Sequence, residues 1–241
     1  MANKKPTFDI NAFAAPKFSV PLPVSGKRVF VRTLLMKEYK NFFIAKESGK
    51  ENQKGALMDA VRQALSAVVE GVDDVMRLPP GDVEYIFIQL YISSTGKTHI
   101  PIRYKCECGN EVVTNIDLNT VSVTEQVGTG RIVVNENNLI VMRSPTQEDI
   151  NRHDMDTDEG KLACIIDCID ELHQGEYVFT ASELGADIIE SVMDSLSGEA
   201  FTEMVDFIDG IPRIYSTVDV KCDKCDKSSV LPVIGLADFF V

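Results

Sequence analysis

The chain has 241 residues, of which 44% are hydrophobic and six are cysteines, and its formal net charge is −13. This length and composition allow a full core in one or two domains, and the negative charge disfavours a general nucleic-acid binder, because phosphate contacts need clustered Lys and Arg. No apolar run approaches the roughly 20 residues that cross a bilayer. We expect a soluble protein that is cytoplasmic when made and has no membrane partner.

Residues 1–27 carry four prolines and no sustained apolar period, which predicts an extended N-terminal arm. Three phenylalanines are spaced along this arm, namely Phe8, Phe13 and Phe18. Because aromatic anchors dominate interface energetics, these side chains are candidate contacts for a partner protein.

A strand and several helices are expected over residues 28–97. Residues 28–32 read as a short strand, and Thr33 is a plausible cap for a helix that runs to about Glu47. Apolar residues at helical spacing predict a second helix over 54–70. A Pro-Pro-Gly-Asp sequence then marks the start of a third helix, which ends at Gly96.

Two cysteine knuckles on strand-like flanks, separated by 113 residues, are the strongest chemical signal. Two such hairpins can converge and place four thiolates around one tetrahedral ion, as in a structural zinc ribbon. We therefore predict a discontinuous zinc-ribbon-like β module over residues 98–122 and 213–235. A closed site of this kind leaves no open position for water, so its metal would hold the fold together and do no chemistry. The predicted zinc ligands are Cys106, Cys108, Cys222 and Cys225.

Other interpretations of these cysteines stay open. The second knuckle has the common two-residue gap, whereas only one residue separates Cys106 from Cys108, which is tighter than usual. The four cysteines are alternatively the remains of a site that the family has lost, or ordinary buried thiols. A disulfide framework is the weaker alternative, because the first 16 residues are polar and proline-bounded rather than a signal peptide, and six cysteines are few for a stapled secreted domain.

Between the halves of this module, residues 123–212 are expected to form an inserted hairpin followed by acidic helices. The hairpin is predicted over 131–135 and 138–143, and the helices over 145–152, 159–173, 181–196 and 199–208. From residue 148 to residue 209 there are 18 acidic and 2 basic residues, a net −16, whereas the rest of the chain is +3. This asymmetry indicates a solvated helical face or, alternatively, a surface for a basic partner.

Candidate chemical sites in this insertion fail on inspection. Residues 154–160 resemble the start of a calcium loop, but the required Gly and Glu are absent from its sixth and twelfth positions. Cys164 and Cys168 could ligate a metal with His173, but they flank an apolar helical stripe and are more simply small core residues. His153 before an acidic residue suggests a metal-dependent hydrolase only weakly. We therefore predict that the protein is not an enzyme.

The order of motifs resembles the T4-like bacteriophage baseplate hub and hub-assembly proteins. Four stretches carry this resemblance: 22–29 with the Glu38-Tyr39 helix after it, 78–85 with 90–96, the first knuckle with its tail 115–118, and the C-terminal knuckle. The resemblance implies a non-enzymatic role in building the baseplate hub, with other hub or tail proteins as partners and a homo-oligomer as a further option. It also implies a place in the host cytoplasm during assembly or in the tail of the virion.

Two further expectations complete the α+β prediction of a helical body with a discontinuous cysteine module. The apolar C-terminal tail, residues 236–241, offers Phe239 and Phe240 either to a partner or to the chain's own body.

The alternative function is a zinc-ribbon nucleic-acid-binding module, for which the basic candidates are Lys105, Lys221, Lys224 and Lys227. These lysines more simply neutralise the thiolates.

Overall fold

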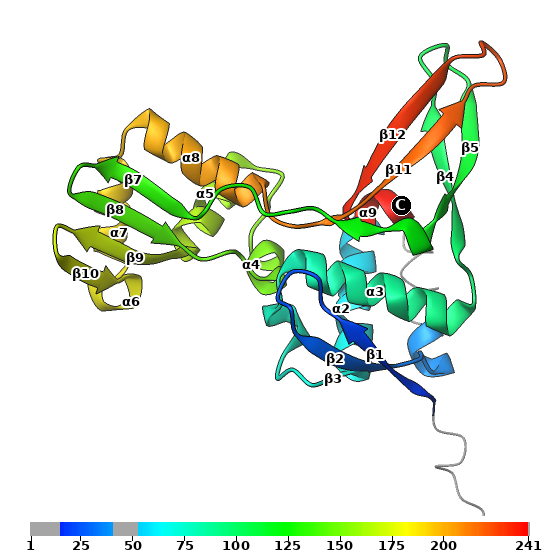
Figure 1. Cartoon of the computed structure of the whole chain (residues 1–241), viewed down its shortest axis with the longest axis horizontal. Helices are drawn as coiled ribbons and strands as arrows, with labels where there is room; N and C mark the ends of the chain where they lie inside the picture. The colour runs from blue at the N-terminus through cyan, green and yellow to red at the C-terminus, as the bar shows by residue number, and fades with distance from the viewer. Residues whose placement is uncertain (1–14, 41–52, 241) are drawn as a thin grey trace, which may run out of the picture.

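The computed structural model of the protein describes residues 15–40 and 53–240. A mixed body of helices and strands carries two projecting β-hairpins on one side and a separate, elongated insertion on the other (Figure 1). The chain leaves the body for the insertion after β6 (Ser122–Val123) and returns to it at β11 (Ile214–Lys221). The α+β class predicted from the sequence is confirmed.

Among the described residues, the centre of the body is a three-stranded antiparallel sheet with two long helices and a short 3-10 helix. Its elements are β1 (Lys17–Pro21), β2 (Arg28–Arg32), α2 (Gln53–Val68), β3 (Val69–Glu70), η3 (Val75–Arg77) and α3 (Pro80–Thr95). Helix α3 begins with Pro80 at a position that needs no N–H donor, and it ends at Gly96, whose φ of 68° only glycine adopts readily. Ile86, Ile88 and Leu90 are all fully buried, which places α3 in the centre of the core.

The predicted N-terminal arm is wrong at its C-terminal end. Residues Lys17–Pro21 form β1, which pairs along its whole length with β2. The physical reason is the alternation of Phe18 and Val20, which turn inward onto the body core, with the exposed Lys17 and Ser19. Residues 33–35 are not helical, and the helix predicted from Thr33 begins at residue 36.

Two antiparallel hairpins carry the cysteines at their tips, and we call them the cysteine hairpins. The first is β4 (His99–Lys105) with β5 (Glu111–Asp117), and the second is β11 with β12 (Ser228–Ile234). They project side by side from the body (Figure 1), where β5 lies against β11. Their bases are anchored in the body core through Ile100, Ile116 and Val218. The 3-10 turn η4 (Leu118–Thr120) leads from β5 into β6.

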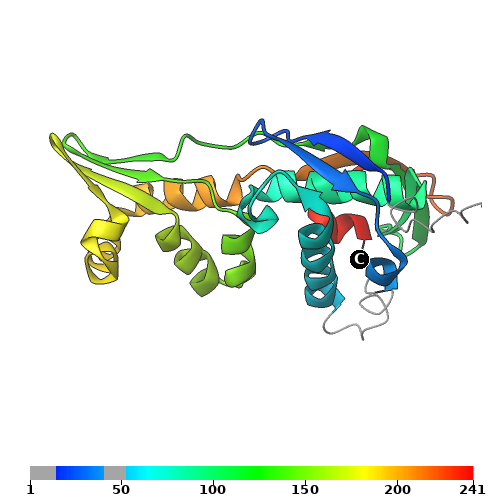
Figure 2. The same cartoon turned by 90° about the horizontal axis from the view of Figure 1, so that it is seen from below.

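The insertion has its own hydrophobic core between a four-stranded antiparallel sheet and several helices. The sheet order is β10-β9-β8-β7, and the helices lie on one side of it (Figure 2). The elements are β7 (Arg131–Asn135), β8 (Asn138–Met142), α4 (Gln147–Arg152), α5 (Asp158–Asp167), β9 (Ile169–Gln174), β10 (Tyr177–Thr180), α6 (Ala181–Leu184), α7 (Ala186–Asp194) and α8 (Gly198–Asp209).

Two predicted helices of the insertion need correction. The helix expected over 159–173 stops at Asp167, because the segment from Ile169 onward pairs with β8 and β10 as the inner strand β9. The helix expected over 181–196 is divided into α6 and α7 at Gly185, whose φ is 81°. The predicted hairpin is thus half of a larger sheet, and the insertion is mixed rather than helical.

Two buried carboxylates at the start of α3 join distant parts of the chain. Asp82, with no exposed surface, accepts hydrogen bonds from the backbone N–H groups of Val24 and Ser25 at 2.8 and 3.0 Å. Glu84, which is 1% exposed, accepts from Arg213 and from the backbone N–H of Ile214 at the start of β11. These contacts fix the β1–β2 turn and the base of the second cysteine hairpin on one helix.

The predicted C-terminal tail forms α9 (Gly235–Phe240) and packs on the body. Phe239 is 2% exposed, and the ring of Phe240 meets Phe87 and Tyr91 edge-on at centroid distances of 5.4 and 5.2 Å. Of the two roles considered for this tail, packing on the chain's own body is the one found, because burial of both rings removes apolar surface from water. Among the described helices, none is both long and apolar enough to cross a membrane.

Candidate functional site

The four knuckle cysteines meet at the tips of the cysteine hairpins. Their sulphur atoms all lie within 4.8 Å of one another. The Sγ atoms of Cys106 and Cys225 are 3.7 Å apart, and so are those of Cys108 and Cys222, so each close pair joins one hairpin to the other. All four are free thiols, because a disulfide would bring two sulphurs to about 2.05 Å. The convergence of the two knuckles expected from the sequence is therefore present.

The arrangement fits a tetrahedral metal ion. Four sulphurs at about 2.3 Å from a zinc ion lie about 3.8 Å from each other, which is close to the 3.7 Å separations found here. Cys106 and Cys222 are buried, whereas Cys108 and Cys225 are exposed at the tip. Four thiolate donors suit a soft or borderline ion such as zinc and leave no position for a substrate. The cluster could thus hold a structural metal.

Each knuckle is shaped by its own backbone turn. In the first, the N–H of Cys106 donates to the carbonyl of Asn110, and in the second the N–H of Cys222 donates to the carbonyl of Lys227. The first turn is one residue shorter, which accommodates its one-residue gap. Both turns pass through the left-handed region directly after the second cysteine, at Gly109 with φ 84° and at Asp226 with φ 53°.

Polar side chains also tie the two tips together. The Asn110 amide donates to the Asp223 carboxylate at 2.6 Å and to the Cys222 sulphur at 3.7 Å. Lys227 donates to Glu107 across the hairpins at 2.7 Å. Both of these contacts join one hairpin to the other, so they hold the two pairs of sulphur atoms close together without the help of an ion.

The thiols of the second knuckle have unequal acidities. Burial of the Cys222 sulphur opposes its ionisation, but hydrogen bonds from the backbone N–H groups of Lys224 and Cys225 and from neighbouring thiols lower the pKa of Cys222 to about 6. The backbone N–H of Lys227 lowers the pKa of Cys225, but the surrounding cysteine sulphurs outweigh it and raise that pKa to about 12. One thiolate thus forms readily near neutral pH, and its negative charge disfavours ionisation of a second thiol beside it. A bound cation would compensate this repulsion.

The lysines considered for nucleic-acid binding are partly neutralised by acids. Lys227 pairs with Glu107, and Lys221 pairs with Asp226 at 3.1 Å. The tips of the cysteine hairpins therefore present mixed charge rather than a basic surface, which disfavours contacts with phosphates.

The remaining candidate residues lie elsewhere. Cys164 and Cys168 are both fully buried in the insertion core, away from the knuckles. His173 pairs with Glu171 at 2.8 Å on β9. Phe18 is half-buried against the body core. Phe8 and Phe13 lie outside the described residues.

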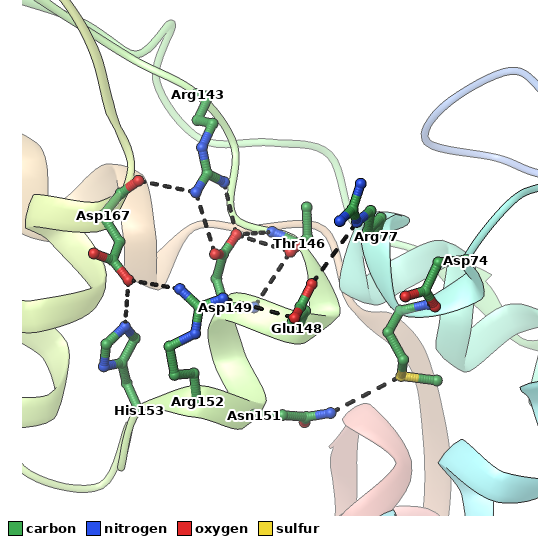
Figure 3. Close-up of polar contacts among 11 residues, drawn as sticks. Asp74, Arg77, Arg143, Thr146, Glu148, Asp149, Asn151, Arg152, His153 and Asp167 are labelled. Atoms are coloured by element: carbon green, nitrogen blue, oxygen red, sulfur yellow. Dashed lines mark hydrogen bonds and ion pairs between the residues drawn. The ribbon is translucent and has the colours of Figure 1, made fainter. Parts of the chain in front are cut away.

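His153 belongs to a cluster of ion pairs at the base of the insertion, shown in Figure 3. Its Nε2 atom lies 2.9 Å from Asp167, which also accepts from Arg152 at 3.1 Å. Arg143 forms two hydrogen bonds to the buried Asp149 at 2.6 and 3.2 Å and a third to the Asp167 carbonyl. All these polar groups are paired with one another, so the cluster connects β8, α4 and α5 and resembles a structural joint more than a reaction centre.

A cleft of about 560 Å³ lies beside this cluster, between the body and the insertion. It is lined from α2 by Met58, Asp59 and Arg62, from η3 by Asp74 and Met76, and from α4 by Glu148, Asn151 and Arg152. Asp74 caps the 3-10 helix and Arg152 contacts Glu148 and Asp167, so these lining groups already have partners. The cleft contains no nucleophile with an adjacent base among the described residues.

Sequence reasoning missed the two buried carboxylates of α3, of which Asp82 holds the β1–β2 turn and Glu84 positions the second cysteine hairpin through β11. A signal was available, because Asp82 and Glu84 both lie in an otherwise apolar stretch, and charged residues are buried only when paired.

Comparisons with known proteins identify a family for this chain. The family model described as T4 bacteriophage base plate protein matches residues 15–241. The chain is 22% identical over 228 residues to "Baseplate hub assembly protein gp26" of Enterobacteria phage T4, an alignment that covers 93% of this chain and 98% of that protein. No solved structure matches. The match spans the body, the insertion and both cysteine hairpins, so the chain belongs to the T4 bacteriophage base plate protein family.

Proposed function

We propose that this protein helps to assemble the phage baseplate hub and acts by binding other baseplate proteins rather than by catalysis. The observation that carries the proposal is the alignment with the T4 hub assembly protein, which covers nearly all of both chains. An alignment of that extent includes the body, the insertion and the cysteine hairpins together, so the proposed role belongs to the whole architecture rather than to one shared segment.

The chemistry of the described residues supports a binding role. The clustered thiols have the donor set of a closed metal site, and His153 is engaged in an ion-pair joint at the base of the insertion. By contrast, several large apolar side chains are exposed on the insertion and the hairpins, among them Val133, Tyr177 and Val230. A protein that works through contacts needs such surfaces on a rigid scaffold.

We propose further that the four-cysteine cluster binds one structural zinc ion. The ligands would be Cys106, Cys108, Cys222 and Cys225, which come from both hairpins and are separated by more than 100 residues of chain. The ion would supply a cross-link between the tips and no chemistry, because its four positions are filled by protein. Such a cross-link would keep both hairpins in one orientation for a partner to bind.

The proposed function is tested by reconstituting baseplate assembly from the remaining baseplate proteins with and without this chain. We expect hub-containing complexes, counted by sedimentation and electron microscopy, to form only when the chain is present. A protein that acts by binding alone contributes in proportion to its amount. The yield of hub-containing complexes should therefore rise with the chain's concentration until the binding sites are saturated. Equal hub formation in its absence would overturn the proposal.

The nucleic-acid-binding alternative is tested in the same preparation. Phosphate binding would produce affinity for DNA or RNA that falls steeply with added salt. We expect no such salt-dependent binding, because the lysines of the hairpin tips are partly paired with acids and the chain is net −13.

A further inference from the structure

The four-stranded sheet of the insertion has two faces of different character. On one face Ile132, Ile140 and Leu172 are paired across adjacent strands and pack into the insertion core. The helices that cover this face all lie on the same side of the sheet, as Figure 2 shows. Because side chains alternate along each strand, the residues next to these point to the opposite face, which no described helix covers.

We call this uncovered surface the open face. A row of directly paired residues crosses it through all four strands: Val133 on β7, Leu139 on β8, His173 on β9 and Val178 on β10. Val133 and Val178 are 67% and 53% exposed. Four strands span about 14 Å, so this row, in which His173 is the one polar member, forms a mainly apolar band wide enough for one element of another protein. Apolar side chains on both edge strands are not needed for the insertion's own core, which lies on the other side.

Acidic residues surround the open face. At the tip, the β7–β8 turn carries Glu136 and the β9–β10 turn carries Glu176, and a hydrogen bond of 2.7 Å from Gly175 to the carbonyl of Asn137 holds the two turns together. Glu171 lies on the open face itself, paired across the strands with Val141 and Thr180, and it contacts His173 at 2.8 Å. Arg131 lies on the same face, opposite Val141, and is the basic residue of this row. The wider segment 148–209 is net −16. The surface thus has a mainly apolar centre, a border that is acidic apart from Arg131, and a strongly negative surrounding field.

We propose that the open face is a docking surface for a basic protein that presents an apolar strip between Lys or Arg side chains. This inference rests on the proposed assembly function and names the chemistry of the partner. Apolar burial at the centre would supply affinity, and the acidic border would steer a positively charged surface into place. A second copy of this chain is the poorer occupant, because face-to-face contact would bring two segments of −16 together.

The experiment uses the full chain and a defined probe, a labelled synthetic peptide that alternates Lys and Val. Two comparison peptides alternate Glu with Val and Lys with Ser. Fluorescence anisotropy should show binding of the Lys-Val peptide and none of the other two. Binding should weaken by roughly tenfold or more when ionic strength rises from about 0.05 to 0.3 M, because that shortens the screening length of the acidic border.

Variants locate the binding site. Val133→Ser and Val178→Ser should each reduce binding by at least about tenfold, because each removes apolar surface from the band without adding a charge that would attract the lysines of the peptide. The matched control is Val113→Ser, which changes a similarly exposed valine, 62% exposed, on β5 outside the insertion and should leave binding unchanged. Melting curves of all variants identify any that do not fold. Val178→Thr, which keeps the β-branched shape at lower apolarity, replaces a variant that fails.

Four outcomes would overturn the proposal: no binding of the Lys-Val peptide, equal binding of the Glu-Val peptide, no loss of binding in Val133→Ser and Val178→Ser, or self-association that Val133→Ser abolishes. The last would assign the open face to a second copy. None of these results bears on whether the chain is needed for hub formation, so the reconstitution experiment still decides the proposed function separately.

Discussion

Glu84 and Arg213 are 129 residues apart in the sequence and form a partly buried ion pair in which Arg213 contacts Glu84 Oε1 through both Nε and Nη2, at 2.9 and 2.6 Å. The same carboxylate accepts the backbone N–H of Ile214 at 3.0 Å and that of Leu236 at 3.4 Å. One side chain on α3 thereby fixes the start of β11, which leads to the second cysteine knuckle, and the start of α9. The second cysteine hairpin is thereby anchored to the body at its base.

Removal of this carboxylate should be costly. Glu84→Ala would leave the Arg213 guanidinium without its partner and the Ile214 N–H without an acceptor, so we expect the free energy of unfolding to fall by about 3 kcal/mol or more. Urea denaturation followed by circular dichroism measures this change. The control is Glu70→Ala, which breaks the exposed Lys17–Glu70 pair and should cost less than about 1 kcal/mol. Equal losses in the two variants would contradict the anchoring role of Glu84.

The stability of the protein should depend on the carboxylate of Asp82 even when the side chain keeps its size. Its two carboxylate oxygens accept the N–H groups of Val24 and Ser25 separately, and the side chain has no exposed surface. Asp82→Asn replaces one acceptor by a donor that faces an N–H, so we expect a loss of about 1–3 kcal/mol and faster amide hydrogen exchange at Val24 and Ser25. Asp59→Asn changes an exposed aspartate on α2 and serves as the control. Unchanged exchange at the turn would show that Asp82 does not hold it.

Gly81 on α3 lies where the body closely approaches the segment that returns from the insertion. A Cβ atom at this position would lie 2.8 Å from the carbonyl oxygen of Pro212 and 2.8 Å from a methyl carbon of Val123. Gly81→Ala should therefore destabilise the protein by about 1–3 kcal/mol, since the backbone must shift. Gly198→Ala, at the first position of α8 with no atom within 4 Å, should be neutral or stabilising by up to about 1 kcal/mol. A thermal melt of both variants settles the comparison, and a stable Gly81→Ala would refute the close approach.

Much of this architecture follows from local rules. The cysteine spacing predicts the convergence of the two knuckles, because four thiolates with turn residues between strands have few other uses in this context. The Pro-Pro-Gly-Asp sequence and Gly96 predict both ends of α3 by the usual start and stop signals. These features depend on residues that are near each other in the sequence.

The sequence-based predictions fail where strand pairing between distant segments overrides the local sequence pattern. Leu162, Ile165 and Ile169 continue a helical period into residue 172, yet the segment from Ile169 forms the inner strand β9 because β8 and β10 offer hydrogen-bonding edges on both sides. Likewise, the prolines of the N-terminal region indicate an arm, whereas Lys17–Pro21 pairs with β2 and turns Phe18 and Val20 inward. The open face could not be foreseen either, since it exists only once four strands are assembled.

The ion pair at the base of the insertion gives a pH-dependent contribution. Burial raises the pKa of Asp149, but hydrogen bonds from Arg143 and from the backbone and hydroxyl of Thr146 outweigh it and lower the pKa from 3.8 to about 2. The folded-state pKa is depressed, so the stabilisation is present above about pH 4 and is lost as the pH falls towards 2. A shift of this size corresponds to about 2 kcal/mol.

Comparison with Asp149→Asn measures this contribution. Across pH 5 to 2 the wild type should lose about 2 kcal/mol more stability than the variant, which lacks the titrating group. Asp154→Asn, at an exposed aspartate of the same insertion, should follow the wild-type curve. Parallel curves for wild type and Asp149→Asn would show that the Arg143–Asp149 pair does not stabilise the folded state.

The proposed zinc cross-link is tested by metal content and by chelation. We expect one zinc ion per purified chain, and treatment with a strong chelator should lower the melting temperature on the order of 10 °C, which corresponds to a few kcal/mol for a chain of this size. Cys106→Ser and Cys225→Ser should each abolish stoichiometric zinc, because each removes one member of the 3.7 Å sulphur pair that joins the hairpins. The control is Cys168→Ala, which removes a cysteine outside the cluster and should still bind one ion. If a ligand variant does not fold, chelation of the wild type still decides the question. The absence of both zinc and a chelator effect would contradict the cross-link and leave the hairpin tips joined by Asn110–Asp223 and Glu107–Lys227 alone.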